Sequence, residues 1–267
     1  MEKIIRVEHV DFSYNKPSSF IKDMSFEIPR GKYTCIIGPN GSGKTTVSKL
    51  ISGILVSDKG DIFVDGMIIN NQNMPEIRKY IGVIFQNPDN QYMSSSLKED
   101  IIFALENHNV DPNKMEEIID EAARKCNASH LLAKSPSSMS GGEKQKGNLA
   151  SVLALEPKVL VLDEACSMLD GTSKKEMRHL ISNMKEEGIT IVSITHDSEE
   201  LLLADYIILM NKGEIVFEGN KEELYKFDTS LYNVELPYIM QLEKEMGNGN
   251  FSSEEEFLYK VGETLWK

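Results

Sequence analysis

The glycine-rich stretch GPNGSGKT, residues 38–45, fits the pattern G-x-x-x-x-G-K-[ST]. Its glycines let successive backbone N–H groups curl around phosphate oxygens, and the start of the following helix adds partial positive charge. Lys44 can bridge the phosphates of a nucleotide, and the Thr45 hydroxyl can ligate Mg²⁺. The pattern predicts a triphosphate site, whose expected contacts are Gly38, Pro39, Asn40, Gly41, Ser42, Gly43, Lys44, Thr45 and Thr46.

Two carboxylates follow the apolar run in KVLVLDEA, residues 158–165. Asp163 is placed to hold Mg²⁺ beside the phosphates, and Glu164 is placed to orient an attacking water as a general base. Alone, the pair could equally be part of a helix-starting turn. Beside a phosphate loop, it favours nucleotide hydrolysis.

Two more polar side chains end apolar runs. His196 closes ITIVSITHD, residues 189–197, and Gln86 follows KYIGVIF, residues 79–85. We interpret His196 as a sensor of the γ-phosphate, because its strand ends beside those of Glu164 and the phosphate loop. The Gln86 amide oxygen could reach the metal or the water, although a surface glutamine explains it equally well. The predicted catalytic residues are Glu164, His196 and Gln86, and the predicted metal ligands are Thr45, Gln86 and Asp163.

A second glycine-containing stretch, MSGGEKQK at residues 139–146, stands in front of another apolar run. Ser140, Gly141 and Gly142 offer a hydroxyl and backbone N–H groups at the start of a helix, which again suits a γ-phosphate. The chain already carries a phosphate loop, so the residues alone leave open what this stretch binds.

Strands alternating with helices are expected to position these side chains. Apolar or alternating runs predict strands at residues 3–14, 33–38, 79–85, 158–165, 189–197 and 205–220. Helical spacing predicts helices at residues 43–55 (with a stop at Gly60), 97–107, 114–126, 143–155 and 173–188. This order indicates an α/β fold with a mostly parallel sheet. Tyr14 follows the first strand and could stack on adenine, although lone aromatic residues are more often part of the core.

Composition restricts the possible partners. The chain has 42 acidic and 29 basic residues among 267, a net charge of −13, and no basic stripe, so nucleic acid is a poor partner. Its three cysteines are scattered without a CxxC pair, which excludes a disulfide framework and suits a reducing compartment. The start does not resemble a signal peptide, and no apolar run approaches the roughly 18 residues of a spanning helix. We therefore expect a cytosolic chain that can sit on a membrane through a partner.

Five motifs in register resemble the nucleotide-binding subunit of an ABC transporter: GPNGSGKTT, FQNPDNQ, MSGGEKQK, VLVLDEACSMLD and SITHD. The resemblance covers residues 3–225 and implies a P-loop NTPase fold with a mostly parallel core sheet, an antiparallel β subdomain and a helical subdomain. FQNPDNQ and the tail are similar to the energy-coupling factor (ECF) group, which imports vitamins or transition-metal ions such as cobalt or nickel. NPDNQ and SMLD look like the first of its two paired ATPase subunits.

The resemblance also implies a role for the second glycine stretch. In this family two subunits pack head to tail, and each ATP lies between one phosphate loop and the partner's SGG loop. The residues implied to contact the partner's nucleotide are Ser140, Gly141, Gly142, Glu143 and Asp170. The implied cofactors are ATP and Mg²⁺. The implied partners are a second ATPase subunit (a paralogue or an identical copy), a transmembrane coupling protein and a substrate-binding membrane protein, at the cytoplasmic face of the membrane.

By this resemblance, residues 1–226 form the nucleotide-binding domain, with a helical part at about 88–155. Residues 227–267 form a C-terminal segment of two short amphipathic helices, 236–246 and 252–267, joined by the flexible GNGN at 247–250, and we regard this segment as a candidate dimerisation element. Residues 86–107 are expected to touch the transmembrane partner. Four positions depart from the family pattern: Met139, Lys146, Cys166 and Gly171.

Two alternatives to a transport ATPase remain at this point. One is an ABC ATPase that acts on nucleic acid or in cofactor assembly, although the chain lacks the long coiled coil or second cassette of such relatives. The other is a regulatory subunit that binds ATP without hydrolysing it. Glu164 argues against the second alternative, whereas Lys146 and Gly171 leave it open.

Overall fold

A six-stranded sheet forms the centre of the molecule, in the order β10-β9-β3-β8-β7-β6. The computed structural model describes residues 2–15 and 20–241. The six strands are β3 (Tyr33–Ile37), β6 (Ile81–Ile84), β7 (Val159–Asp163), β8 (Thr190–Ile194), β9 (Tyr206–Asn211) and β10 (Glu214–Gly219). Only β10 pairs antiparallel within this sheet. The predicted mostly parallel core sheet is therefore confirmed.

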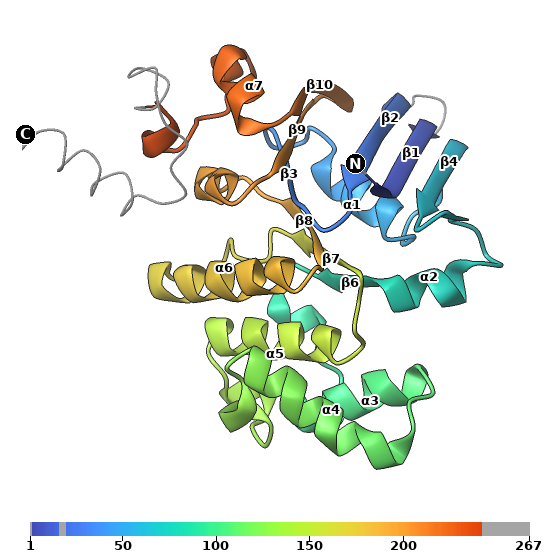
Figure 1. Ribbon diagram of the computed structural model, residues 1–267, viewed down its shortest axis with the longest axis vertical. Coiled ribbons are helices and arrows are strands. Elements are labelled where there is room, and N and C mark those ends of the chain that lie inside the picture. The colour runs from blue at the N-terminus through green and yellow to red at the C-terminus, as the bar shows by residue number, and fades with distance from the viewer. Residues whose placement is uncertain (1, 16–19, 242–267) are drawn as a thin grey trace, which may run out of the picture.

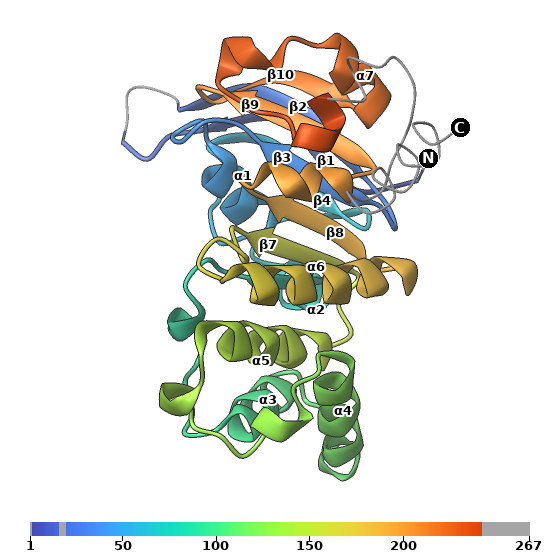
Figure 2. The same cartoon turned by 90° about the vertical axis from the view of Figure 1, so that its left-hand side faces the viewer.

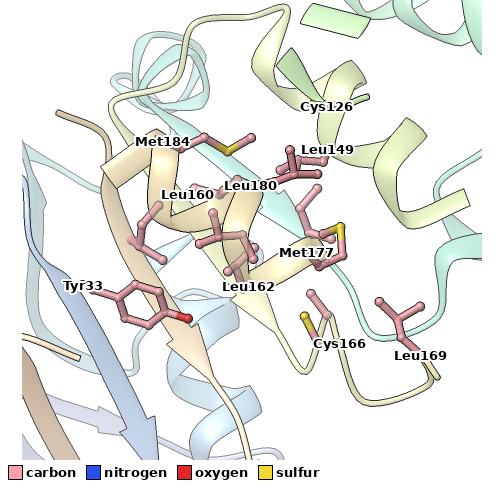
Figure 3. Close-up of a cluster of buried hydrophobic side chains, with 14 of the residues drawn as sticks. Tyr33, Cys126, Leu149, Leu160, Leu162, Cys166, Leu169, Met177, Leu180 and Met184 are labelled. Carbon is pink, nitrogen blue, oxygen red and sulfur yellow. The ribbon is translucent and has the colours of Figure 1, made fainter. Parts of the chain in front are cut away.

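Both faces of the central sheet are covered. Alternate residues of a strand point to opposite faces, so Cys35 and Ile36 of β3 enter two different hydrophobic cores. Figure 3 shows one core, in which Leu160 and Leu162 of β7 lie near Met177 and Leu180 of the helix that covers this face. Burial on both faces explains why the parallel strands read as continuous apolar runs.

A second, antiparallel sheet has the order β2-β1-β4-β5 and packs on the other side of the central sheet. Its strands are β1 (Lys3–Phe12), β2 (Ile21–Pro29), β4 (Lys59–Val64) and β5 (Met67–Ile68). This is the antiparallel β subdomain that the resemblance implied, although the sequence patterns located only its first strand. The predicted helix stop at Gly60 is wrong, because α1 already ends at Ile51 and Gly60 lies inside β4.

The helices divide into two groups. The helices α1 (Lys44–Ile51), α2 (Met74–Tyr80), α6 (Gly171–Glu186) and α7 (Lys221–Lys226) pack around the two sheets. A separate layer at one end of the molecule contains α3 (Leu97–Asn107), α4 (Pro112–Lys125) and α5 (Gly141–Leu153) (Figures 1 and 2). Helix α5 joins this layer to α6 and β6. Within residues 2–15 and 20–241, no helix is long and apolar enough to cross a bilayer.

The predicted strand region at residues 205–220 is a hairpin of β9 and β10. Lys212 and Gly213 form its turn, with φ angles of 49° and 82°, which is the backbone geometry of tight hairpins. After α7 the chain makes a short turn at Thr229–Tyr232, and a new helix begins at Tyr238. The second predicted C-terminal helix and residues 242–246 of the first lie outside the described residues.

Candidate nucleotide-binding and hydrolysis site

The predicted phosphate loop, residues 38–43, connects the end of β3 to the start of α1. Gly38 has a φ angle of 146°, and a Cβ atom there would collide with the backbone carbonyl oxygen of Met210. Gly43 caps α1 with a φ angle of 109°. The loop therefore needs glycine at these two positions to reach the start of the helix, where backbone N–H groups favour an anion.

Lys44, the first residue of α1, is only 5 % exposed and lies beneath the loop. Its Nζ donates hydrogen bonds to the carbonyl oxygens of Gly38 (2.8 Å) and Pro39 (3.0 Å). Burial lowers the pKa of Lys44, and the charges of Glu164 and Asp163 oppose that effect. The cation is thus held at the loop by neutral oxygens, which a phosphate can replace.

Thr45 and Asp163 bring together the side chains expected to hold Mg²⁺. The Thr45 hydroxyl donates to Asp163 Oδ1 at 3.3 Å, and Asp163 is buried at the end of β7. Burial raises the pKa of Asp163, whereas hydrogen bonds from Ser48 and Thr45 lower it. A hydroxyl and a carboxylate are oxygen donors of the kind that Mg²⁺ prefers, so these residues fit the ion.

Two side chains from neighbouring strand ends converge on one carboxylate oxygen of a third residue, Glu164. Gln86 Nε2 donates to Glu164 Oε2 at 2.9 Å, and His196 Nδ1 lies 3.5 Å from the same oxygen. Gln86 lies two residues beyond β6, Glu164 directly follows β7, and His196 lies two residues beyond β8. The structure therefore gathers the three predicted catalytic side chains, while their individual roles stay predictions.

The backbone of Glu164 is unusual, because its φ angle is 54°. A residue with a Cβ atom adopts this left-handed conformation only at some cost, and Glu164 is one of nine non-glycine residues in the described chain that do so. The Glu164 N–H donates to the carbonyl oxygen of Ile194 at 2.8 Å, and its carbonyl accepts from the Ser167 hydroxyl at 2.8 Å. These bonds hold the turn that directs the carboxylate toward Gln86.

Tyr14 lies beside α1, as an adenine-stacking residue would have to. Its hydroxyl is 3.1 Å from Thr46 Oγ1, its ring packs edge-on against Phe12 with centroids 4.9 Å apart, and the side chain is 56 % exposed. The ring is thus anchored on one side and open on the other. Its contact with adenine stays a prediction.

Ser140 caps α5, the helix that begins in the second glycine stretch. Its hydroxyl accepts from the Glu143 N–H, and Glu143 Oε2 accepts from the Ser140 N–H at 2.8 Å, which completes a capping box. Glu143 Oε1 also accepts from Lys134 at 2.8 Å, and hydrogen bonds from Lys134 and Ser140 lower the pKa of Glu143 to about 2. Both carboxylate oxygens of Glu143 are therefore engaged within the chain.

Gly141 has open space around the position where a Cβ would stand, whereas a Cβ on Gly142 would touch Ser173. Asp170, the other residue implied to contact a partner's nucleotide, caps α6 by accepting from the N–H groups of Thr172 and Ser173. The N-termini of α5 and α6 thus lie close together, and the one at Gly141 is accessible.

The second glycine stretch and the phosphate loop lead into helices that pack against different elements. Helix α1 packs on β4, β7 and β8, whereas α5 packs on α3, α4, α6 and β6. A cavity of about 380 Å³ beside the phosphate loop is lined by residues 37–40, 195–198, Leu201 and 233–235, and its lining includes none of Ser140–Gly142. The N-terminus of α5 therefore lies outside this cavity and has room at Gly141.

Two parts of the site were missed by sequence reasoning. Ser48 hydrogen-bonds Asp163 from α1, three residues beyond Thr45, and this helical spacing could have indicated it. Residues 233–235 line the cavity beside the phosphate loop. No local pattern marks these three, because their position depends on the path of the chain after α7.

The comparisons with known proteins agree with this geometry. Residues 21–167 match the family model described as ABC transporter. The energy-coupling factor transporter ATP-binding protein EcfA1 of Listeria monocytogenes is 38 % identical over 272 residues, covering 100 % of this chain and 98 % of that protein. EcfA1 of Staphylococcus aureus is 41 % identical over 249 residues, with 92 % and 93 % covered.

The chain belongs to the ABC transporter ATP-binding family. Among solved structures it is similar to cbiO1 from Clostridium perfringens, with a TM-score of 0.79 and 32 % identity over 91 % of this chain and 100 % of that one. That protein is described as part of the ABC transporter complex cbiONQ. The predicted P-loop NTPase fold and the resemblance to the ECF ATPases are both confirmed.

The four departures from the usual ABC ATPase pattern have definite places in the structure. Met139 and Cys166 are buried in the core shared by α5 and α6. Lys146 of α5 forms an ion pair with Glu176 of α6, and so keeps a charged link between these helices. Gly171 is the first residue of α6, with open space where a side chain would project. None of the four residues belongs to the phosphate loop, and none is among the side chains that meet at Glu164 Oε2.

Proposed function

We propose that the chain hydrolyses MgATP within a dimer of ATPase subunits and thereby energises an ECF-type importer. The observation that carries this proposal is the convergence of Gln86 and His196 on Glu164 Oε2, beside a phosphate loop with a buried lysine. A structural pair of carboxylates would not need an amide and an imidazole on one oxygen. The relatives at 38–41 % identity that match nearly the full chain are named as ECF ATP-binding proteins, which favours transport over the two alternatives.

In the proposed mechanism, Lys44 exchanges its two carbonyl partners for oxygens of the β- and γ-phosphates. The Glu164 carboxylate accepts a proton from a water molecule while the water oxygen bonds to the γ-phosphorus. The bond between the γ-phosphorus and the oxygen that bridges to the β-phosphate breaks, which releases ADP and phosphate. Gln86 holds the carboxylate in position, and His196, beside the same oxygen, would sense the γ-phosphate. Bound at Thr45 and Asp163, Mg²⁺ would neutralise charge on the phosphates, and the Gln86 amide oxygen is a further proposed ligand.

An ATPase subunit of this type requires partner proteins. We propose a second ATPase subunit, either a paralogue or an identical copy, whose ATP would be covered by Ser140, Gly141, Gly142, Glu143 and Asp170. The capping box of Glu143 means that its contribution would act through the loop shape. A transmembrane coupling protein and a substrate-binding membrane protein would place the chain at the cytoplasmic face of the membrane. The cargo would be a vitamin or a transition-metal ion, chosen by the membrane components.

The boundaries of the domains are also part of this proposal. Residues 1–226 would form the nucleotide-binding domain with its helical part at about 88–155, and residues 227–267 would contribute to dimerisation. Phosphate release by the complex, together with co-purification of membrane proteins with the full chain, tests the transport function. A chain that hydrolyses ATP but isolates without any membrane protein would favour the soluble alternative.

The arrangement in trans predicts a specific effect of Gly141→Asp. Because Gly141 is exposed and has room for a side chain, the isolated full chain should fold and bind MgATP with nearly unchanged affinity. In the assembled complex, the new carboxylate would face the γ-phosphate of the partner's nucleotide. Hydrolysis at that site should fall by roughly tenfold or more, since like-charge contacts across an interface cost several kcal/mol.

A matched control is Asn113→Asp, which also adds a carboxylate to the first turn of an exposed helix N-terminus, that of α4. This variant should leave both nucleotide affinity and hydrolysis unchanged. Weaker MgATP binding by the isolated, folded Gly141→Asp chain would mean that the loop serves its own nucleotide, and the arrangement in trans would be rejected.

A further inference from the structure

Gln145, on the second turn of α5, is completely buried and bridges two catalytic segments. Its Nε2 donates one hydrogen bond to the carbonyl oxygen of Phe85 at 3.1 Å and another to the carbonyl oxygen of Ala165 at 2.7 Å. Phe85 immediately precedes Gln86, and Ala165 immediately follows Glu164. One NH₂ group therefore joins the backbones that carry the two contacting side chains.

The hydrogen bonds of this bridge satisfy buried polar groups on both sides. A buried amide needs acceptors for both of its N–H groups, and a buried carbonyl outside a strand or helix needs a donor. Gln145 meets both requirements at once, because Phe85 lies just beyond β6 and Ala165 just beyond β7. The 2.9 Å contact between Gln86 and Glu164 spans the same gap between the two strand ends.

A second buried amide of α5, that of Asn148, lies beside the bridge but makes neither of its two hydrogen bonds. Asn148, one turn further along α5, donates through Nδ2 to Gln145 Oε1 at 3.4 Å and to the Pro88 carbonyl at 3.2 Å. Toward the other end, Ser140 caps the same helix five residues before Gln145, which is roughly 7.5 Å along the axis. A rigid, short stretch of helix thus separates the accessible N-terminus at Gly141 from the bridge.

We propose that Gln145 is a positioning residue for hydrolysis, which sets the distance between Gln86 and Glu164 and ties it to the N-terminus of α5. This inference rests on the proposed function, because only in the dimer does that N-terminus meet the partner's nucleotide. When the partner's ATP binds, a small shift of α5 moves both hydrogen-bonded carbonyl groups, those of Phe85 and Ala165, along with the helix. The chain's own catalytic pair then responds to occupancy of the other site.

The test compares Gln145→Met with Asn148→Leu in the full chain and in the assembled complex. Both variants replace a buried amide of α5 by an apolar side chain of similar size, and both remove a bond to the loop at residues 85–88. Asn148→Leu also removes the 3.4 Å contact with Gln145 Oε1, but it leaves both hydrogen bonds that Gln145 Nε2 donates, and only Gln145→Met releases Ala165. We expect similar losses in Tm for the two variants. For Gln145→Met alone, kcat should fall about tenfold or more while the KM for ATP and the Kd of the isolated chain for MgATP stay within twofold.

Equal kcat values for the two variants at matched losses in Tm would overturn the inference, because the bridge would then be only structural. A loss confined to KM would overturn it as well. If Gln145→Met does not fold, Gln145→Ala provides the same comparison with Asn148→Ala. Wild type and Glu164→Gln are measured in the same assay, so that absent wild-type hydrolysis, or unchanged hydrolysis by Glu164→Gln, would reject the proposed function instead.

Discussion

Lys44→Ala should abolish tight MgATP binding while leaving the chain folded. Lys44 Nζ is the cation at the phosphate loop, where it already lies within hydrogen-bond distance of two loop carbonyls. Hydrogen bonds to charged groups contribute about 1.5–3 kcal/mol each. Losing those to the triphosphate should weaken binding by roughly 10²-fold or more, as measured by equilibrium titration of the full chain.

Lys49→Ala is the matched control for this variant. Lys49 lies on the same helix, α1, but in its last turn, away from the loop. Lys49 is half-buried and acts on the site only through the attraction between its charge and Asp163, so its removal should weaken MgATP binding a few-fold at most, far less than removal of Lys44. If Lys44→Ala bound MgATP as tightly as Lys49→Ala does, the assignment of residues 38–45 as the phosphate loop would be wrong.

Glu164→Gln should keep MgATP binding and lower turnover by about 10²–10⁴-fold, the usual range for loss of a general base. Glutamine has nearly the shape of glutamate, so the contacts with Gln86 and His196 can largely persist, but a neutral amide cannot take a proton from water. The ATP-bound dimer should then accumulate in its closed form. Phosphate release by the complex and size-exclusion chromatography with MgATP measure the two effects.

Glu156→Gln provides a demanding control, because Glu156 is exposed and has a φ angle of 50°, close to that of Glu164. The two substitutions therefore make the same chemical change in the same backbone conformation. Only the change at residue 164 should affect hydrolysis. Turnover by Glu164→Gln close to that of Glu156→Gln would assign the base to another group and revive the regulatory alternative.

The buried parallel strands and their polar ends could be predicted from the sequence. Val159–Asp163 and Thr190–Ile194 are buried throughout, so their apolar runs are unbroken, and Glu164 and His196 stand where those runs stop. Because adjacent parallel strands end at one edge of a sheet, the meeting of these side chains follows from the pattern. The phosphate loop was predictable for a similar reason, since its glycines have a local steric requirement.

Several other elements have only weak patterns in the sequence and were not predicted from it. Strand β2 has one face toward solvent and a left-handed residue, Asp23, which interrupts its alternation. Helix α2 has seven residues with one buried side chain, Ile77, which is too few for a periodic pattern. The hairpin turn uses lysine at residue 212, where asparagine or aspartate is the usual signal. The bridge made by Gln145 had no local signal, since it joins segments brought together only by the fold.

The left-handed backbone of Glu164 has a consequence for protein engineering. A Cβ atom in this conformation costs about 1–2 kcal/mol, a penalty that glycine would not have. A screen that selects only for thermal stability would therefore favour Glu164→Gly and discard the proposed general base. Residue 164 should therefore be held fixed in any stabilised version of this ATPase, because its left-handed backbone carries the side chain that we propose as the general base.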